Sequence, residues 1–320
     1  MNQRILITGA SGFVGKALTT VMLDAGYTLT CPTRRPLTIT HAALNNPAIT
    51  DLSRDTDWSA FVEQTGAVIH CAARVHVMHD KASDPLAAFR SVNVDATLQL
   101  ARQAAAAGVR HFIFLSSVKV NGESSAPGEP LREQDVATRQ DPYGQSKLEA
   151  EKALLALGKK TGMAVTIIRP PLVYGPGVKA NFQSMLRWVQ RGVPLPLGQT
   201  NNQRSLVYVG NLVHFILHCL YHPQARQEIF QISDGHDLST TELLEACATA
   251  MQTKARLWKI SPDLLTKLAK VLGKQAIAQR LFGSLQVDIS KARSLLGWQP
   301  PFSVAEGLAL TVNPESEPKV

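Results

Sequence analysis

Short, almost continuous apolar runs alternate along this chain with stretches of helical periodicity. The runs are centred near residues 5, 29, 69, 113 and 167, and such runs are typical of strands buried on both faces of a parallel sheet. A shorter strand is expected at 48–52, and a strand at 228–232 is expected to rejoin the main sheet. A helix is expected at 92–107, ended by Gly108. This alternation predicts an α/β fold with a doubly wound parallel sheet.

A glycine-rich turn lies between the first apolar run and the first helical stretch. From Thr8 to Gly15 it reads T-G-A-S-G-F-V-G. Gly9 would permit the tight turn, Gly12 would let a pyrophosphate approach the backbone, and Gly15 would let the helix lie close to the strand. The free N–H groups and the positive dipole end of that helix favour phosphate. Its place at the first strand–helix junction favours dinucleotide binding over a merely structural turn.

The end of the second strand, 28–31, bears on the choice of cofactor. NAD-specific proteins usually place an acidic residue there to hold the ribose 2′-hydroxyl, whereas this chain continues into Arg34 and Arg35. A carboxylate would repel a 2′-phosphate, while arginine can bind it with two hydrogen bonds. We therefore expect NADP(H) to be preferred, with NAD(H) possible; the alternative is that both arginines are solvated loop residues. Asp51 could accept a hydrogen bond from the adenine amino group.

Tyr143 and Lys147 lie four positions apart, and a helical stretch at 148–157 follows them directly. That spacing places them on one helix face. A lysine cation lowers the pKa of a nearby phenol, so Tyr143 could exchange a proton with a substrate oxygen. Ser117, just after the strand 111–115, could hydrogen-bond the same oxygen. The Tyr-x-x-x-Lys pattern is common by itself, but after a Ser-Ser strand end and a glycine-rich turn it predicts catalytic groups.

Histidines recur at every fourth position along and just after a predicted helix at 211–221. His214, His218 and His222 resemble a metal-binding stripe, but apolar residues fill the remaining faces of the helix. Together with Asn211 the histidines form its only polar face, so a solvated surface is the better interpretation. No metal site is predicted.

Composition and charge narrow the classes of partner. No apolar run of the 320 residues approaches the length of a membrane span, and the first apolar run begins at residue 4, so we expect neither a membrane span nor a signal peptide. The four cysteines are far apart and suggest a reducing cytoplasm. The net charge of +8 fits an acidic ligand, a nucleic acid or an anionic membrane surface. Because the basic residues form no long run and are not interleaved with aromatic residues, we expect a small anionic ligand and no nucleic acid.

The motifs occur in the order found in the extended short-chain dehydrogenase/reductases, and the chain is most similar to their nucleotide-sugar epimerase/dehydratase branch. The resemblance extends over roughly residues 3–312. The combination of motifs is specific for this family, although no single motif is. It is carried by the glycine turn, the Ala72-Ala73 strand end, Asn93, Ser117, Tyr143, Lys147, the turn at 169–177, Arg204 and the segment that begins at Asp288.

This resemblance implies a Rossmann fold, an NAD(P)-dependent enzyme and a UDP-sugar substrate. Tyr143 would be the acid/base, Lys147 would also hold the ribose, and Ser117 would orient the reacting oxygen. Asn93 would support the active-site helix. Cofactor contacts are implied for Gly9, Ser11, Gly12, Phe13, Val14, Gly15, Arg34, Arg35, Asp51, Leu52, Ala72, Ala73, Arg74, Asn93, Lys147 and Pro170. Substrate contacts are implied for Lys119, Asn181, Arg204 and Arg280, with Arg204 on the diphosphate.

Departures from the family pattern affect the expected reaction. Lys119 replaces a small residue or threonine, the usual V-Y-G is Val120-Asn121-Gly122, and Arg280 is a displaced candidate for a second phosphate-binding arginine. The branch suggested by resemblance contains 4-reductases of UDP-4-keto-6-deoxy-N-acetylhexosamines, used in surface-polysaccharide synthesis. We expect hydride transfer from NADPH to the C4 ketone, with Tyr143 protonating the alkoxide. The alternative is a UDP-glucose or UDP-N-acetylglucosamine 4-epimerase with tightly bound NAD.

The expected domain boundaries follow from the same features. Residues 1–170 would form the NAD(P)-binding domain, with the return strand near 228–233, and 171–312 a smaller, mainly substrate-binding domain. The clustered prolines and glycines of 169–177 mark the passage between the two. The polar end, 313–320, is expected to be a flexible tail.

Three further expectations concern the remaining segments. The polar segment 121–142 has no periodicity and is expected to be a functional loop. Residues 239–283 are expected to be mostly helical, and a last helix is expected to open at 288–292. The helices at 92–107 and 146–157 carry alanine and leucine on more than one face. Equivalent helices of related enzymes pair across a twofold axis, so a homodimer is expected.

Overall fold

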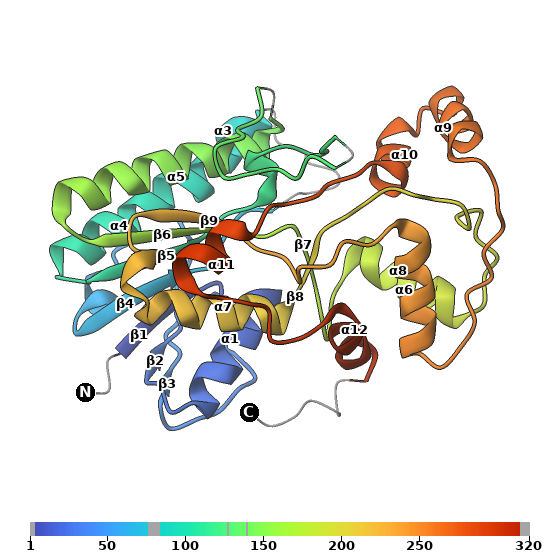
Figure 1. Ribbon diagram of the computed structural model, residues 1–320. Helices are drawn as coiled ribbons and strands as arrows, with labels where there is room; N and C mark the ends of the chain where they lie inside the picture. Colours follow the sequence, from blue (N-terminus) through green and yellow to red (C-terminus); the bar gives the residue numbers. More distant parts are fainter. Residues whose placement is uncertain (1–3, 76–83, 127, 139, 314–320) are drawn as a thin grey trace.

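In the computed structural model, which describes residues 4–75, 84–126, 128–138 and 140–313, seven parallel strands form one main sheet (Figure 1). Their order is β3-β2-β1-β4-β5-β6-β9. The strands are β1 (Arg4–Thr8), β2 (Leu29–Thr30), β3 (Leu44–Asn45), β4 (Thr65–His70), β5 (His111–Leu115), β6 (Ala164–Arg169) and β9 (Glu228–Gln231). The strand order reverses between β1 and β4, where ligands bind in open α/β sheets. The predicted α/β fold class is confirmed.

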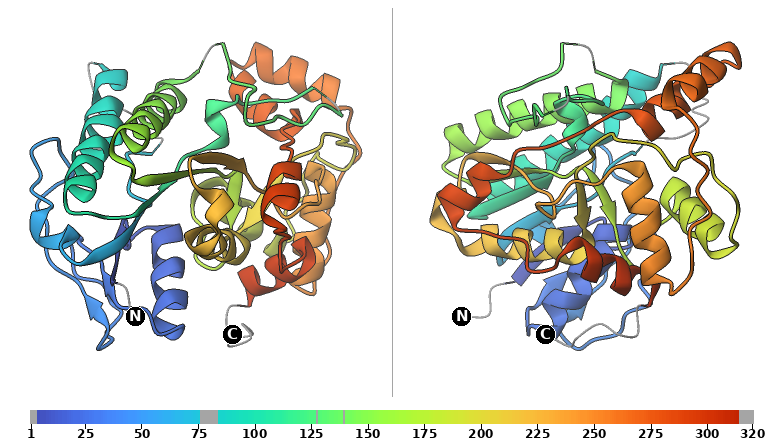
Figure 2. Two further views of the ribbon diagram at one scale, coloured as in Figure 1. Left: turned by 60° about the vertical axis from the view of Figure 1, so that its left-hand side comes forward. Right: turned by 45° about the vertical axis from the view of Figure 1, so that its right-hand side comes forward.

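Helices cover both faces of this sheet (Figures 1 and 2). One face carries α2 (Ser59–Val62), α3 (Pro85–Arg90), η1 (Ser91–Ala96), α4 (Thr97–Ala106) and α5 (Pro142–Thr161), and the other carries α1 (Phe13–Asp24), α7 (Val209–Tyr221) and α11 (Ser290–Leu296). Neighbouring strand residues point to opposite faces. Leu6 therefore packs with Leu100 of α4 and Leu154 of α5, whereas Ile5 and Ile7 pack on the side of α1 and α7.

A second, smaller sheet links the main sheet to the remaining helices. It is the parallel pair β7 (Leu172–Tyr174) and β8 (Leu206–Tyr208). The Tyr174 hydroxyl donates to Asp234 Oδ2 (2.7 Å), and Asn211 Nδ2 donates to Asp234 Oδ1 (2.7 Å), which fixes the pair beside the end of β9. The remaining elements are η2 (Val118–Val120), α6 (Ala180–Gln190), η3 (Pro223–Ala225), α8 (Thr240–Ala250), α9 (Pro262–Val271), α10 (Gln275–Phe282) and α12 (Val304–Val312).

The predicted strand at 48–52 is wrong. The third strand is β3 at Leu44–Asn45, and within 48–52 only Ala48 forms a bridge, with Thr33. The Asn46 side chain donates to the Cys31 carbonyl (2.5 Å) and accepts from the Leu37 N–H (2.8 Å). Pro47 has no N–H to donate to the Cys31 carbonyl, so the regular ladder ends after β3 and the Asn46 side chain supplies the missing donor.

Two helical predictions differ in extent. The helix expected at 92–107 belongs to a longer run that begins at Pro85, passes through the π-helical η1 and ends in α4. The helix expected to be last, opening at 288–292, is α11, and α12 follows it. The sequence analysis missed α12 although Ser303 and Glu306 form its capping box. The predicted tail, 313–320, lies outside the described residues except for Asn313.

The placement of Asn211 on a solvated face is also wrong. Asn211 is fully buried, and besides Asp234 its amide donates to the Phe302 carbonyl (2.8 Å). His214 is exposed, and its Nδ1 accepts from the Trp298 indole N–H (3.0 Å). Within the described residues no group of three or more His, Cys, Asp or Glu is placed to hold a metal ion. The same part of the chain contains no helix long and apolar enough to cross a membrane.

Candidate active site

The glycine turn joins β1 to α1 through very close backbone contacts. Gly9 has a positive φ of 73°, and a Cβ there would lie 2.6 Å from the backbone nitrogen of Ala72. A Cβ on Gly15 would lie 2.1 Å from the Gly9 carbonyl oxygen. Gly12 caps α1 without a side chain, and the first turn of α1 carries no acidic residue. The start of α1 is therefore open to an anion; Ser11 is exposed there, and Phe13 and Val14 are half-buried.

The end of β2 carries basic and no acidic side chains. Arg34 and Arg35 are both exposed, and the Thr33 hydroxyl donates to the Arg35 carbonyl (2.7 Å), which fixes the backbone of this turn. Asp51 is exposed as well, and its Oδ1 accepts from the N–H of Leu52 (2.8 Å). Both arginine side chains are therefore exposed to solvent, and the turn presents positive charge beside β1.

The segment after β4 is held against the start of α5 by one buried side chain. Asn93, in the π-helical turn η1, accepts from the Arg74 N–H (2.8 Å) and donates to the Arg74 carbonyl (3.1 Å). Its Nδ2 also donates to Ser146 Oγ on α5 (2.9 Å). Asn93 thus links the segment after β4 to the helix that carries Tyr143. The small residues Ala72, buried, and Ala73, half-buried, precede Arg74 at this edge.

Tyr143 lies in the first turn of α5, beside the end of β5. Asp141 caps the helix by accepting from the Gly144 N–H (2.6 Å). The Tyr143 hydroxyl and the Ser117 side chain are hydrogen-bonded. Lys147, one turn further along α5, is buried, and its Nζ donates to the Leu115 carbonyl (2.8 Å). The three residues predicted to be catalytic therefore converge at the carboxyl edge of the sheet.

The protonation of this group differs from the sequence expectation. Burial raises the pKa of Tyr143 to about 12, although the hydrogen bond with Ser117 opposes that rise. Burial also lowers the pKa of Lys147 to about 8, while Glu151 and Cys71 oppose that change. The expected lowering of the Tyr143 pKa by Lys147 is absent because the ammonium is bonded to a backbone carbonyl and desolvation dominates. In this geometry Tyr143 holds its proton at neutral pH.

Three of the predicted substrate residues lie in different helical elements, and Arg204 lies just before β8. Lys119 follows Ser117, and its ammonium pairs with Asp141 and with Glu123 (2.8 Å). Asn181 is exposed near the start of α6, and Arg280 is exposed on α10. Arg204 is half-buried, its backbone bridges to Leu238 and to Leu285, and its Nη1 donates to the Gly283 carbonyl just after α10 (2.9 Å).

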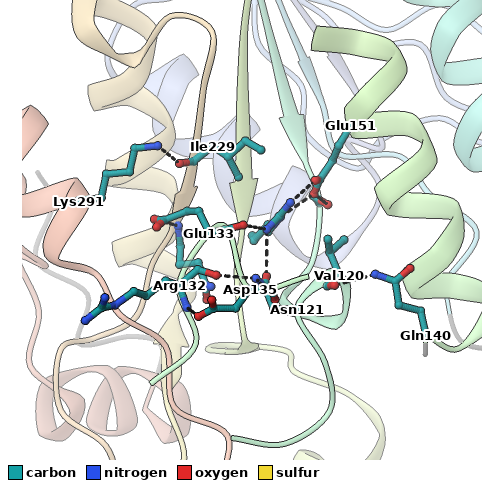
Figure 3. Close-up of polar contacts among 12 residues, drawn as sticks. Val120, Asn121, Arg132, Glu133, Asp135, Gln140, Glu151, Ile229 and Lys291 are labelled. Atoms are coloured by element: carbon teal, nitrogen blue, oxygen red, sulfur yellow. Dashed lines mark hydrogen bonds and ion pairs between the residues drawn. The ribbon is translucent and has the colours of Figure 1, made fainter. Parts of the chain in front are cut away.

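Beneath the site lies a buried ionic network that the sequence analysis missed (Figure 3). Arg169, at the end of β6, forms two hydrogen bonds with the carboxylate of Glu151 on α5, at 2.9 and 2.5 Å. The hydroxyl of Ser116 donates to the same carboxylate. Arg169 Nη1 also donates to the Glu133 carbonyl (2.7 Å) and to Asn121 Oδ1 (3.2 Å). Arg169 and Glu151 are each 1% exposed, so the charges are paired away from water.

This network connects the catalytic edge to the loop at 121–142. Asn121 Nδ2 donates to the carbonyls of Arg132 (2.7 Å) and Asp135 (3.0 Å), and Figure 3 shows these loop residues gathered around Asn121. Glu151 lies one helical turn after Lys147, and its partner Ser116 precedes Ser117. The described residues between 121 and 141 form no helix or strand, as predicted, apart from a single bridge from Leu131 to Val287, and Pro142 begins α5. The sequence contained a signal for this network, because Arg169 ends the apolar run of β6 and a buried charged side chain must be paired.

Another buried polar residue, His70, lies beside Lys147. Its ring nitrogens bond to Thr8 Oγ1 (2.7 Å) and Thr97 Oγ1 (2.9 Å), and its ring stacks on Phe114 at 5.8 Å. Burial, with a smaller effect of the Lys147 charge, lowers the pKa of His70 to about 3. His70 is therefore neutral, and it fixes the end of β4 between β1 and α4. On the other side of β5, the carbonyl of Pro170 accepts from the Val118 N–H (3.0 Å).

Comparison with known proteins agrees with this geometry. The NAD dependent epimerase/dehydratase family matches residues 5–233. A UDP-glucose 4-epimerase of Vibrio cholerae is 45% identical over 315 residues, 97% of this chain and 95% of that protein. A GDP-6-deoxy-D-mannose reductase of Pseudomonas aeruginosa is 27% identical over 321 residues, 96% of this chain and 95% of that protein.

A solved structure supports the fold alone. The UDP-glucuronic acid 4-epimerase of Bacillus cereus in complex with NAD superposes with a TM-score of 0.76 at 20% identity, covering 97% of each chain. The glycine turn, the Ser117–Tyr143–Lys147 group and the parallel sheet all lie within the matched region, 5–233. The chain belongs to the NAD dependent epimerase/dehydratase family, and it is an enzyme of the extended short-chain dehydrogenase/reductase type.

Proposed function

We propose that this enzyme transfers hydride at C4 of a UDP-linked hexose and that its reaction is 4-epimerisation. The observation that carries the proposal is the convergence of Ser117, Tyr143 and Lys147 beside the glycine turn, at the carboxyl edge of the sheet. The 45% identity to a UDP-glucose 4-epimerase over nearly the whole chain favours epimerisation over the reduction that we expected first.

The residues of this site fit a bound dinucleotide, and each of them would have a separate role in binding or in proton transfer. The open start of α1 and the glycine backbone would receive the pyrophosphate. A bound NAD(P) would supply the hydride acceptor and donor. Tyr143 would exchange the proton at the C4 oxygen, and Ser117 would hold that oxygen in place. The buried Lys147 ammonium would hold ribose hydroxyls, and Asn93 would keep the helix of Tyr143 in position.

Net reduction with NADPH is the second candidate, and one observation favours it. The end of β2 carries Arg34 and Arg35, both exposed, where an NAD-specific protein would place an acid. The cofactor of a 4-reductase must leave and be replaced in every cycle, whereas a 4-epimerase regenerates its own cofactor. The two candidates share the role of Tyr143, so the cofactor, and not the catalytic group, distinguishes them.

The function is tested by supplying UDP-glucose and UDP-N-acetylglucosamine to the purified enzyme. We expect the 4-epimer of at least one sugar to accumulate to equilibrium without consumption of added NADPH, measured by NMR of the anomeric protons. NADPH-dependent reduction of a UDP-4-keto sugar, with neither 4-epimer formed, would replace this proposal with the reductase.

The cofactor preference is tested at the end of β2. Replacing Arg34 and Arg35 with alanine removes the positive charge next to a ribose 2′-phosphate, so the affinity for NADPH should fall at least about tenfold and that for NADH should barely change. Fluorescence titration of both cofactors measures the two affinities. The matched control replaces Arg54, which is exposed further along the chain. If the double replacement left the affinity for NADPH unchanged, both arginines would be solvated loop residues.

The diphosphate contact is tested at Arg204. We expect Arg204→Ala to weaken UDP-sugar binding about 10- to 150-fold, because a charged hydrogen bond contributes roughly 1.5–3 kcal/mol, while cofactor affinity stays nearly constant. Calorimetric titration with UDP gives the first affinity and titration with cofactor the second. Arg54→Ala is the control, since Arg54 is exposed and has no assigned role in binding. Equal losses for UDP and cofactor would place Arg204 outside the diphosphate site.

A further inference from the structure

Helix α9 presents an apolar stripe that nothing in the described structure covers. The stripe consists of Leu264, Leu268, Val271 and Leu272, at positions i, i+4, i+7 and i+8, which lie on one helix face. These side chains are 61, 53, 83 and 61% exposed, and no residue of α9 is buried. In Figures 1 and 2 α9 and α10 lie at the periphery of the molecule, beyond the other helices. Core packing therefore does not explain this stripe.

Positive charge is concentrated in the same segment. Residues 251–283 contain seven basic residues and one acidic residue, Asp263, and so carry +6 of the chain's net charge of +8. On α9 itself Lys267 and Lys270 follow one border of the stripe, and Lys274 comes just after the helix. All three lysines are exposed. The combination of an apolar stripe with a bordering row of lysines is typical of helices that lie in the plane of a membrane interface.

We propose that α9, with the basic residues around it, docks the enzyme onto the surface of an anionic phospholipid bilayer. The leucines would enter the boundary between head groups and acyl chains, and the lysines would meet the negative head groups. A second copy of the chain fits this face less well, because a twofold contact through the stripe would bring two sets of like charges together. The expected homodimer uses α4 and α5, which lie on the main sheet instead.

This docking would bring the substrate end of the enzyme close to the membrane. The carbonyl of Gly283, directly after α10, accepts from Arg204, the residue assigned above to the diphosphate. The basic segment therefore ends next to the residue that we propose for the diphosphate. The docking proposal depends only on α9 and its lysines, and it stands whether the enzyme is an epimerase or a reductase.

Co-sedimentation of the full chain with vesicles tests the proposal. We expect binding to vesicles of phosphatidylcholine mixed with phosphatidylglycerol, weaker binding to phosphatidylcholine alone, and release by salt. Lys267→Gln with Lys270→Gln should weaken binding about 25-fold, roughly fivefold for each basic residue. Leu264→Ser with Leu268→Ser should weaken it at least about tenfold. Because α9 buries no residue, both variants should keep wild-type thermal stability and turnover.

Matched controls distinguish docking through α9 from non-specific effects of net positive charge and of exposed apolar side chains. Lys159→Gln with Lys160→Gln removes the same charge from exposed positions at the end of α5, and Trp188→Ser removes an exposed apolar side chain from α6. Both controls should bind vesicles as the wild type does. The proposal is overturned by absence of binding to the anionic vesicles, or by unchanged binding of the leucine variant. It is also overturned if the vesicles stay unbound and light scattering shows a larger assembly that the leucine variant dissociates.

Discussion

Replacing Tyr143 with phenylalanine is expected to lower turnover by about 10²–10⁴-fold, the usual contribution of general acid–base catalysis. The replacement keeps the ring, which packs edge-on against Phe89 at 5.9 Å, and removes only the hydroxyl that is bonded with Ser117. Cofactor affinity should therefore persist. Steady-state kinetics with a UDP-sugar measure turnover, and fluorescence titration measures cofactor binding.

A surface tyrosine provides the control for this experiment. Tyr221 is exposed, and its hydroxyl bonds to that of Tyr27 (2.6 Å), far along the chain from the site. Tyr221→Phe removes a hydroxyl of the same kind and should leave turnover unchanged. If Tyr143→Phe retained more than a tenth of wild-type turnover, the proton transfer would have to be assigned to another group.

Replacing Arg169 with methionine is expected to lower the free energy of unfolding by about 3–5 kcal/mol, because it leaves the carboxylate of Glu151 buried and unpaired. Of its hydrogen-bond partners among the described residues the carboxylate would keep Ser116, and the carbonyl of Glu133 and the side chain of Asn121 would each lose a donor. The loop at 121–142 and the end of β5 should loosen together. Urea denaturation followed by circular dichroism measures the loss.

Two further variants decide whether the unpaired charge causes this loss. Arg132 forms an ion pair with Asp288 at the surface, and Arg132→Met should cost at most about 1 kcal/mol. Adding Glu151→Leu to Arg169→Met removes the unpaired charge and should restore much of the stability. A loss for Arg169→Met no larger than that for Arg132→Met would mean that the buried pair does not hold this region.

The sequence by itself determined the features that depend on neighbouring residues. The apolar runs located the strands β1, β2, β4, β5 and β6, since a strand buried on both faces must be apolar along its length. The return strand expected at 228–232 is β9, at the edge of the sheet. The glycine turn was readable because Gly9 and Gly15 lie against backbone atoms that leave no room for a Cβ. Tyr143 and Lys147 share a helix face through their spacing alone.

Only the tertiary structure decided which polar groups meet and which are removed from water. Glu151 and Arg169 come from different elements, and Asn211 is buried by residues after β9 and by Phe302. The Asn46 side chain donates to the Cys31 carbonyl, where Pro47 has no N–H to continue the ladder. The same holds for the raised pKa of Tyr143, because desolvation depends on every segment packed around the hydroxyl. Periodicity describes one helix or strand at a time, whereas burial and hydrogen-bond partners are set by segments far apart in the chain.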